Sequence, residues 1–222
     1  MKKIMILTAS ALIFGAATSQ AQITIAPEAG INLANWHERD KDPITGKTDK
    51  EDGDLKIGVK VGANVNIPIG DHFAIQPGLF YSIRGSKLET ESVLGTVKSN
   101  STVHYADIPV NFQYMFNDPD EGRFFIGVGP YLGIAFSGKA KQTGGGLPES
   151  TYDYKFGNDA KSNDLERFEF GAQGNAGYLL KSGIFFRAMY QLGITNLIPQ
   201  AESGNSLKST NITVSVGYNI GG

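Results

Sequence analysis

Strict alternation of apolar and polar residues, clearest from Leu55 to Ile69, is the feature that most constrains this fold. Every odd-numbered residue of the segment is apolar, and the positions between them hold Lys, Gly, Asn or Pro. A period of two residues is that of a β-strand with one apolar and one polar face. A tilted strand of about 9–11 residues crosses a bilayer. The segment is therefore long enough to span a membrane as a strand.

The same alternation recurs along the chain and predicts eight strands. Connections are long after the first, third, fifth and seventh strands and short after the others. Bacterial outer-membrane barrels have even strand numbers, short periplasmic turns and longer extracellular loops. We therefore predict an all-β fold, an eight-stranded antiparallel up-and-down transmembrane β-barrel with both ends periplasmic. The predicted strands are 23–35, 55–69, 73–85, 104–116, 124–137, 166–180, 184–195 and 210–220.

The N-terminus has the order of a secretory signal peptide. Lys2 and Lys3 precede an apolar run, 4–17, and small residues lie just before Gln22. The run is shorter than the roughly 20 residues of a spanning helix. We predict a signal peptide at 1–21, cleaved on export, and one barrel domain at 22–222. The chain has no cysteine, so packing and backbone pairing alone stabilise the fold. Its net charge of −2 gives no electrostatic reason to expect nucleic-acid binding.

Alternation alone does not show whether the apolar face meets lipid or lines the core of a soluble, lipocalin-like barrel. The polar face is rich in glycine, which suits a narrow lumen, and the apolar face carries no charge between its ends. A charge at the lipid midplane costs about 2–4 kcal/mol. Aromatic residues also gather in two belts at the strand ends, as at membrane interfaces. The belts are Phe73, Tyr114, Phe116, Phe124, Tyr178, Phe186 and Tyr218 near the short turns, and Tyr81, Phe136 and Phe168 near the long loops.

Seven ionisable residues fall on the polar, inward face. In an eight-stranded barrel the side chains just fill the lumen, so buried charges need partners. We expect Arg84 to pair with Asp107 on the neighbouring strand, and Glu28 to pair with Lys60. A plug of satisfied ion pairs is favoured over a proton or ion path. The predicted lumen cluster comprises Glu28, Lys56, Lys60, Arg84, Asp107, Glu169 and Arg187.

Motifs for catalysis or cofactors are weak, and we predict no catalytic, cofactor-binding or metal-ligating residue. His37, His72 and His104 have no evident nucleophile partner, apart from an imaginable pair of His104 with Ser101 at the outer rim. The segment 118–122 echoes a calcium loop without its full ligand pattern. The segment 46–48 resembles the end of a phosphate loop, but Lys41 stands where the first glycine is required.

Several segments in order resemble a known family over essentially the whole mature chain. The aromatic-x-acidic-Ile-Pro-hydrophobic pattern of Tyr105–Val110 resembles the fourth strand of the outer membrane protein beta-barrel domain family common in Bacteroidetes, which includes PorT-like proteins. The segments 125–133, 75–82 and 187–193 are similar to its fifth, third and seventh strands. The resemblance implies an outer-membrane location and no single activity. The chain departs from the pattern at its end, where Tyr218 is followed by Asn-Ile-Gly-Gly rather than by a terminal aromatic residue.

Together these features predict a non-enzymatic outer-membrane barrel with a structural, adhesive or ligand-binding role through its long extracellular loops. The alternatives are a small porin-like channel or secretion-system accessory barrel, and an acyl transferase or protease at the outer rim. We expect outer-membrane lipid and the barrel assembly machinery as partners, and a monomeric state. The extracellular ligand is not readable from the residues.

Overall fold

The computed structural model describes residues 23–42, 45–92, 95–116, 122–201 and 204–221. The predicted signal peptide and most of the calcium-loop-like segment 118–122 lie outside these ranges. No helix among the described residues has the length and apolar character needed to cross a membrane.

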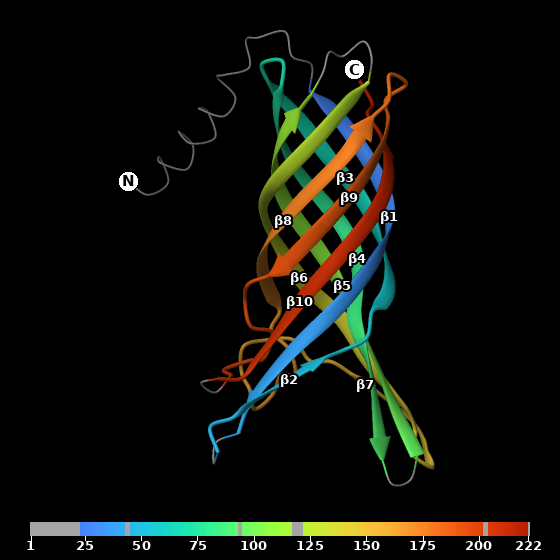
Figure 1. Ribbon diagram of the computed structural model, residues 1–222, viewed down its shortest axis with the longest axis vertical. Helices are drawn as coiled ribbons and strands as arrows, with labels where there is room; N and C mark the ends of the chain where they lie inside the picture. Colours follow the sequence, from blue (N-terminus) through green and yellow to red (C-terminus); the bar gives the residue numbers. More distant parts are fainter. Residues whose placement is uncertain (1–22, 43–44, 93–94, 117–121, 202–203, 222) are drawn as a thin grey trace.

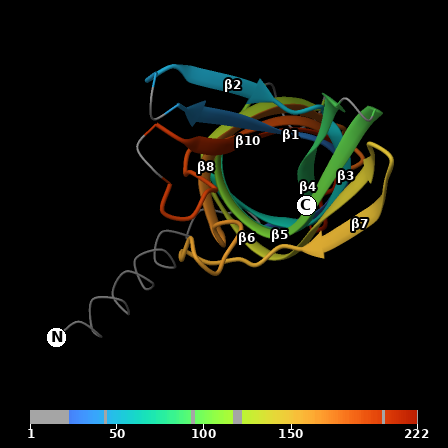
Figure 2. The ribbon, with the colours of Figure 1, turned by 90° about the horizontal axis from the view of Figure 1, so that it is seen from below.

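Ten strands are described, and eight of them close into an antiparallel ring (Figure 2). The ring runs β1, β3, β4, β5, β6, β8, β9 and β10, and β10 pairs back onto β1. β2 pairs with β1 and β7 with β6, outside the ring. The predicted eight-stranded up-and-down barrel is confirmed. The bounds are β1 Thr24–Lys41, β2 Thr48–Asp52, β3 Lys56–Ile69, β4 Phe73–Ser92, β5 Gly95–Met115, β6 Arg123–Gly144, β7 Leu147–Asp153, β8 Phe168–Leu179, β9 Ile184–Gly193 and β10 Ser206–Tyr218.

The two ends of the barrel differ in their connections (Figure 1). Strands β3, β5 and β8 end, and β4, β6 and β9 begin, at the end that carries the C-terminus, called here the inner end. Strands β1, β4, β6 and β9 end at the opposite, outer end, where the additional strands β2 and β7 follow β1 and β6. At the outer end the β4–β5 and β6–β7 hairpins project well beyond the ring.

Pairing at the outer end continues further than the alternation predicts. The expected loop 86–102 is instead the tip of the β4–β5 hairpin, and the expected loops 37–54 and 138–165 contain β2 and β7. Toward their tips both faces of these extensions meet water, so no apolar face marks them in the sequence. Backbone hydrogen bonding still favours paired strands there. These three predicted loops were too long.

The apolar face of the ring points outward and the polar face fills the lumen. The side chains of Ile57 and Val128 are 68% and 65% exposed on the wall, whereas Asn64 and Asp107 are 0% exposed inside. This is the reverse of a soluble lipocalin-like barrel, whose core is apolar. The predicted orientation is therefore confirmed.

Lumen glycines make room for inward-pointing rings. A Cβ added at Gly171 would collide with the ring of Tyr131, and one at Gly177 with the ring of Phe125. Small residues on one strand and large rings on a neighbouring strand therefore interlock. The glycine-rich polar face follows from the limited width of an eight-stranded lumen.

Aromatic side chains form contacts on the outer wall near both ends. At the inner end, Phe73 lies 5.1 Å from Tyr114, centroid to centroid, and Phe124 lies 4.6 Å from Tyr178. At the outer end, Tyr81 lies 6.3 Å from Phe136. These pairs lie in the two aromatic belts expected from the sequence.

Candidate functional site: the filled lumen and its outer mouth

The outer half of the lumen is organised around Arg84 of β4, whose side chain is 1% exposed. Its guanidinium forms an ion pair with Asp107 of β5 and a second one, at 3.1 Å, with Glu169 of β8. Ser82 accepts a hydrogen bond from Arg84 Nε at 3.1 Å and donates its hydroxyl to Asp107 at 2.8 Å. The expected pairing of Arg84 with Asp107 is present, and Glu169 joins it.

Glu169 connects this cluster to two further strands. Its Oε1 accepts hydrogen bonds from the Tyr131 hydroxyl of β6 at 2.5 Å and from the Ser209 hydroxyl of β10 at 2.6 Å. The rings of Tyr105 and Tyr131 lie 4.6 and 5.4 Å from the Arg84 guanidinium carbon, within the range of cation–π attraction. One buried cation thereby ties together five strands of the ring.

A second ion pair lies nearer the inner end. Nη1 of Arg187 on β9 is 3.1 Å from Oε2 of Glu28 on β1. Glu28 also accepts hydrogen bonds from Asn64 at 3.0 Å and from Ser215 at 2.6 Å. The expected Glu28–Lys60 pair does not form, so that prediction is wrong. Arg187 lies opposite the small Ser215 of β10, and its long side chain reaches past that strand to the carboxylate.

The two lysines of the predicted cluster behave differently from the arginines. Lys60 is buried without an ion pair among the described residues; its Nζ lies 3.4 Å from the Met189 sulfur and 4.7 Å from the centre of the Phe80 ring. Lys56 lies at the outer end, where its Nζ donates to Asn100 Oδ1. The lumen proper therefore holds three cations and three anions, and Lys56 belongs to the mouth.

Amide and hydroxyl side chains fill the space between the charged clusters. Gln173 donates to Asn111 at 2.6 Å, Gln191 to Gln173 at 2.9 Å, and Asn211 to Gln191 at 2.8 Å. Thr213 of β10 then donates to Asn32 of β1 at 2.8 Å. These contacts run around the inside of the wall from β5 to β1. These hydrogen bonds tie the strands together from the inside, while Asn111 Nδ2 and Asn211 Oδ1 are buried without a hydrogen-bond partner among the described residues.

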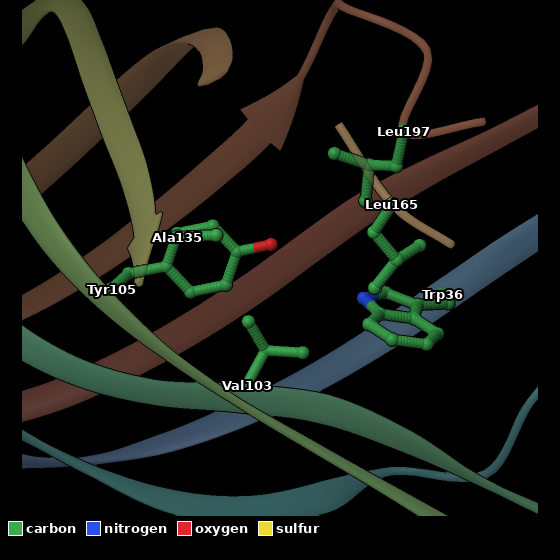
Figure 3. Close-up of a cluster of buried hydrophobic side chains, with 6 residues drawn as sticks. All are labelled: Trp36, Val103, Tyr105, Ala135, Leu165 and Leu197. Carbon is green, nitrogen blue, oxygen red and sulfur yellow. The ribbon is translucent and has the colours of Figure 1, made fainter. Parts of the chain in front are cut away.

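Apolar clusters occupy both ends of the lumen. At the inner end, Ala26, Phe125 and Phe185 are buried together. At the outer end, side chains from β1, β5, β6 and two connections converge, as Figure 3 shows. We call this second group the outer cap; its members are Trp36, Val103, Tyr105, Ala135, Leu165 and Leu197, with Tyr154, Phe156 and Leu207 packed against it.

The histidines take part in local contacts rather than in a catalytic arrangement. His104 Nδ1 lies 2.6 Å from the Tyr81 hydroxyl on the outer wall, whereas the inward Ser101 hydroxyl lies 2.7 Å from the Tyr154 hydroxyl. The structure therefore does not bring Ser101 and His104 together. His37 bridges Asp52 and Thr210 at 2.7 and 2.8 Å, and His72 stacks on Tyr114.

Other motifs singled out in the sequence add no site. Among the described side chains, no group of three or more His, Asp or Glu residues is placed to hold a metal ion. Of the segment 46–48, Gly46, at φ 69°, and Lys47 precede β2, and Thr48 is the first residue of that strand. Residues 118–121 lie outside the described chain.

The outer cap is a packed region that the sequence did not reveal. Its strand members, Trp36, Val103, Tyr105 and Ala135, lie on inward positions that continue the polar lumen face, so alternation assigns them no special role. The signal was present at Trp36, the only tryptophan, which comes just before a charged stretch and just after the predicted end of the first strand. The partners Leu165 and Leu197 come from connections whose paths no periodicity specifies.

Three solved structures of outer-membrane proteins are similar to this chain. The outer membrane protein OprG from Pseudomonas aeruginosa is 11% identical, with a TM-score of 0.48, covering 91% of this chain and 97% of that one. Neisserial surface protein A is 11% identical, with a TM-score of 0.46, covering 88% and 97%. The outer membrane protease OmpT from Escherichia coli is 10% identical, with a TM-score of 0.44, covering 92% and 100%. No curated protein sequence gives a significant match.

The family assignment comes from the sequence model that matches most of the chain. The model described as outer membrane protein beta-barrel domain matches residues 18–199. That range contains the whole ring except its last strand, β10. The chain belongs to the outer membrane protein beta-barrel domain family.

Proposed function

We propose that this protein is a closed, non-enzymatic outer-membrane barrel that binds external ligands through its outer end. The observation that carries the proposal is the filled lumen: paired charges and hydrogen-bonded amides occupy its length, and apolar clusters occupy both ends. A conducting pore needs a continuous water-filled path. Buried ion pairs such as Arg84 with Asp107 would have to separate to open one, at a high cost.

The outer end supplies the surface for binding. The β4–β5 and β6–β7 hairpins form a four-stranded extension, in which β5 pairs with β6 as far as Val97 opposite Gly144. His37 fixes β2 against β1 and β10. Surfaces already ordered before binding lose less entropy when a ligand docks. This order favours a binding role over a structureless loop surface.

Planar-bilayer recording of the purified full-length protein tests the closed lumen. We expect no steady ion current, with a general porin in the same bilayers as the positive control. A steady, concentration-dependent current through the wild-type protein would contradict the proposal and favour the porin-like alternative.

The absence of enzymatic activity is part of the proposal. It is supported by the separate contacts of Ser101 and His104, each of which bonds a different tyrosine. A His104→Ala variant should match wild-type protein in peptide- and lipid-hydrolysis assays, with both at background. Activity of the wild-type protein that His104→Ala abolishes would support the outer-rim enzyme instead.

Export and partners complete the proposal. We infer that residues 1–21 are removed on export, that the barrel assembly machinery inserts the chain and that outer-membrane lipid surrounds it as a monomer. The apolar wall and its aromatic belts support the lipid contact. N-terminal sequencing of protein from outer-membrane fractions should begin at Gln22, and cross-linking in native membranes should give a monomer band.

The PorT-like, Bacteroidetes branch of the family is our proposal for the finer assignment. It rests on the four motifs quoted above, of which Tyr105–Val110 is the most distinctive. Deleting the gene in its own host should leave protein secretion intact if the barrel acts in binding. A specific secretion defect would favour the accessory-barrel alternative.

A further inference from the structure

A small pocket opens at the outer mouth, beside the outer cap. Its volume is about 210 Å³, and it lies where β1, β4, β5, β10 and the connection after β7 meet. Drug-sized ligands occupy pockets of roughly 300–1,000 Å³, so this one suits a single ring rather than a larger molecule.

One wall of the pocket is aromatic and aliphatic. The ring of Tyr154 stands edge-on to that of Trp36, with centroids 6.4 Å apart and planes at 60°. Leu165 and Leu207 continue this wall. Trp36 is 9% exposed and Leu165 is 5% exposed, so the wall is part of the packed cap and holds its shape.

The facing wall carries hydroxyl groups. Ser86 of β4 and Ser99 and Ser101 of β5 line it. Ser86 and Ser101 are 7% and 9% exposed. The hydroxyls of Ser101 and Tyr154 are hydrogen-bonded at 2.7 Å, so the two sides of the pocket meet at this edge.

Backbone contacts fix the remaining side. Gly53 N–H donates to the Trp36 carbonyl at 3.1 Å, and Asp54 and Lys87 exchange backbone hydrogen bonds at 2.7 and 3.2 Å. A Cβ at Gly53 would collide with the Ser86 hydroxyl, so this close approach requires glycine. The pocket is therefore preformed, which lowers the entropy lost on binding.

We propose that this pocket binds one pyranose ring of an extracellular glycan, an assignment that rests on the proposed binding role of the outer end. A pyranose presents C–H groups on its faces and hydroxyls around its edge. The rings of Trp36 and Tyr154 can pack against the C–H faces of the sugar. The hydroxyls of Ser86, Ser99 and Ser101 can hydrogen-bond with the sugar hydroxyls. Glu38 and Lys87 are exposed at the rim, so the interior offers no buried charge for an ionic ligand.

The single tryptophan makes the proposal directly measurable. Trp36 is the only tryptophan in the chain, so its fluorescence in the full-length, detergent-solubilised protein reports on the pocket alone. The probes are the methyl glycosides of glucose, galactose, mannose and N-acetylglucosamine, with glycerol as the control polyol. We expect a saturable emission change for at least one glycoside, with a Kd of about 1 mM, as for a weak single-site ligand. No saturable change with any of the four, or an equal change with glycerol, overturns the proposal.

Matched variants locate the site. Ser99→Leu fills the pocket from a half-buried position and should weaken glycoside binding by at least about tenfold. Ser150→Leu makes the same change at an exposed position on β7, outside the pocket, and should leave affinity unchanged. Ser99→Ala, which cannot disturb packing, should show an intermediate loss. Retained binding in Ser99→Leu, or equal losses in both leucine variants, contradicts the assignment.

The two proposals fail separately. A steady bilayer current would refute the closed, ligand-binding barrel whatever the sugars do. If the protein shows neither a bilayer current nor a fluorescence change with any glycoside, the saccharide pocket is refuted and the closed barrel is still supported.

Discussion

Strands β1 and β5 pass through two regions whose interiors have opposite chemistry. Midway along the apolar wall their inward residues are polar, such as Asn32 and Asp107, both 0% exposed. At the outer end of the wall apolar inward residues follow, such as Trp36 and Val103 in the outer cap. The outward residues change in the opposite sense, from Ile108 on the wall to the exposed Lys98 at the tip.

This inversion shows that the surrounding medium, rather than the strand, decides what lies inside. In lipid, burying an apolar side chain gains little because the tails are equally apolar, while polar groups must find partners within the protein. In water, the hydrophobic effect drives apolar side chains inward. The lumen is therefore held by paired polar groups and the cap by packing.

Arg84→Met should give the largest effect, because it leaves Asp107 and Glu169 buried without their cation. Breaking a buried ion pair costs about 3–5 kcal/mol. The free energy of unfolding, measured by guanidine titration in lipid vesicles, should fall by that amount. Lys98→Met breaks the exposed Lys98–Glu89 pair at the hairpin tip and should cost less than about 1 kcal/mol. Equal losses in the two variants would remove the distinction between lumen and tip.

Val128→Lys tests the boundary between the two regions on the outward face of β6. Val128 is 65% exposed on the apolar wall, and a lysine there should cost roughly 2–4 kcal/mol. The reverse change further along the same strand, Lys139→Val, lies where the face is exposed beyond the wall. It should alter the unfolding free energy by no more than about 0.5 kcal/mol. If Val128→Lys loses no stability in the same titration, the wall is not in lipid.

The smallest expected effect is the pH dependence of the stability of the outer cap, which lies outside the membrane-spanning part. Burial raises the pKa of Tyr154 to about 12, although its hydrogen bond with Ser101 acts the other way. An unfolded tyrosine ionises near pH 10, so the folded cap favours the protonated phenol. Its contribution to stability is complete below about pH 10 and is lost as the pH rises through 12.

Limited proteolysis of the outer segments should report this loss. Cleavage of the wild-type protein should accelerate between about pH 10 and 12, whereas Tyr154→Phe should lack that step. The exposed Tyr152 also raises the pKa of Tyr154, so Tyr152→Phe should move the step to lower pH without removing it. A pH step that persists in Tyr154→Phe would assign it to another group.

The sequence predicts the lipid-embedded region well because lipid imposes strict alternation there. Segments such as Leu55–Ile69 specify strand, face and orientation together. Arg84 and Asp107 lie on adjacent strands, and because Asp107 is opposite Phe80, the long arginine side chain spans an offset of four residues to reach it. The partner of Glu28 was missed because pairing depends on side-chain reach. Arg187 extends past Ser215, and Lys60 turns instead to Met189 and Phe80.

The outer region was harder to predict because water lies on both sides of its hairpins. The paired hairpin tip, 86–102, has no alternation of apolar and polar residues that would distinguish it from a loop, so its backbone pairing cannot be recognised in the sequence. The outer cap forms only because the connections that contain Leu165 and Leu197, which have no regular secondary structure, place these two side chains over the lumen. Only contacts distant in sequence bring them to Trp36.

The glycines beneath the lumen rings limit how such a barrel can diverge. Tyr131 occupies the space that a side chain at Gly171 would need, and Phe125 does the same at Gly177. A larger residue at either glycine is tolerable only if the ring shrinks in the same step, and a smaller ring alone leaves a void. The identities of the residues at these paired positions are therefore coupled, and a side chain can be added at Gly171 or Gly177 only together with a smaller residue in place of the ring beside it.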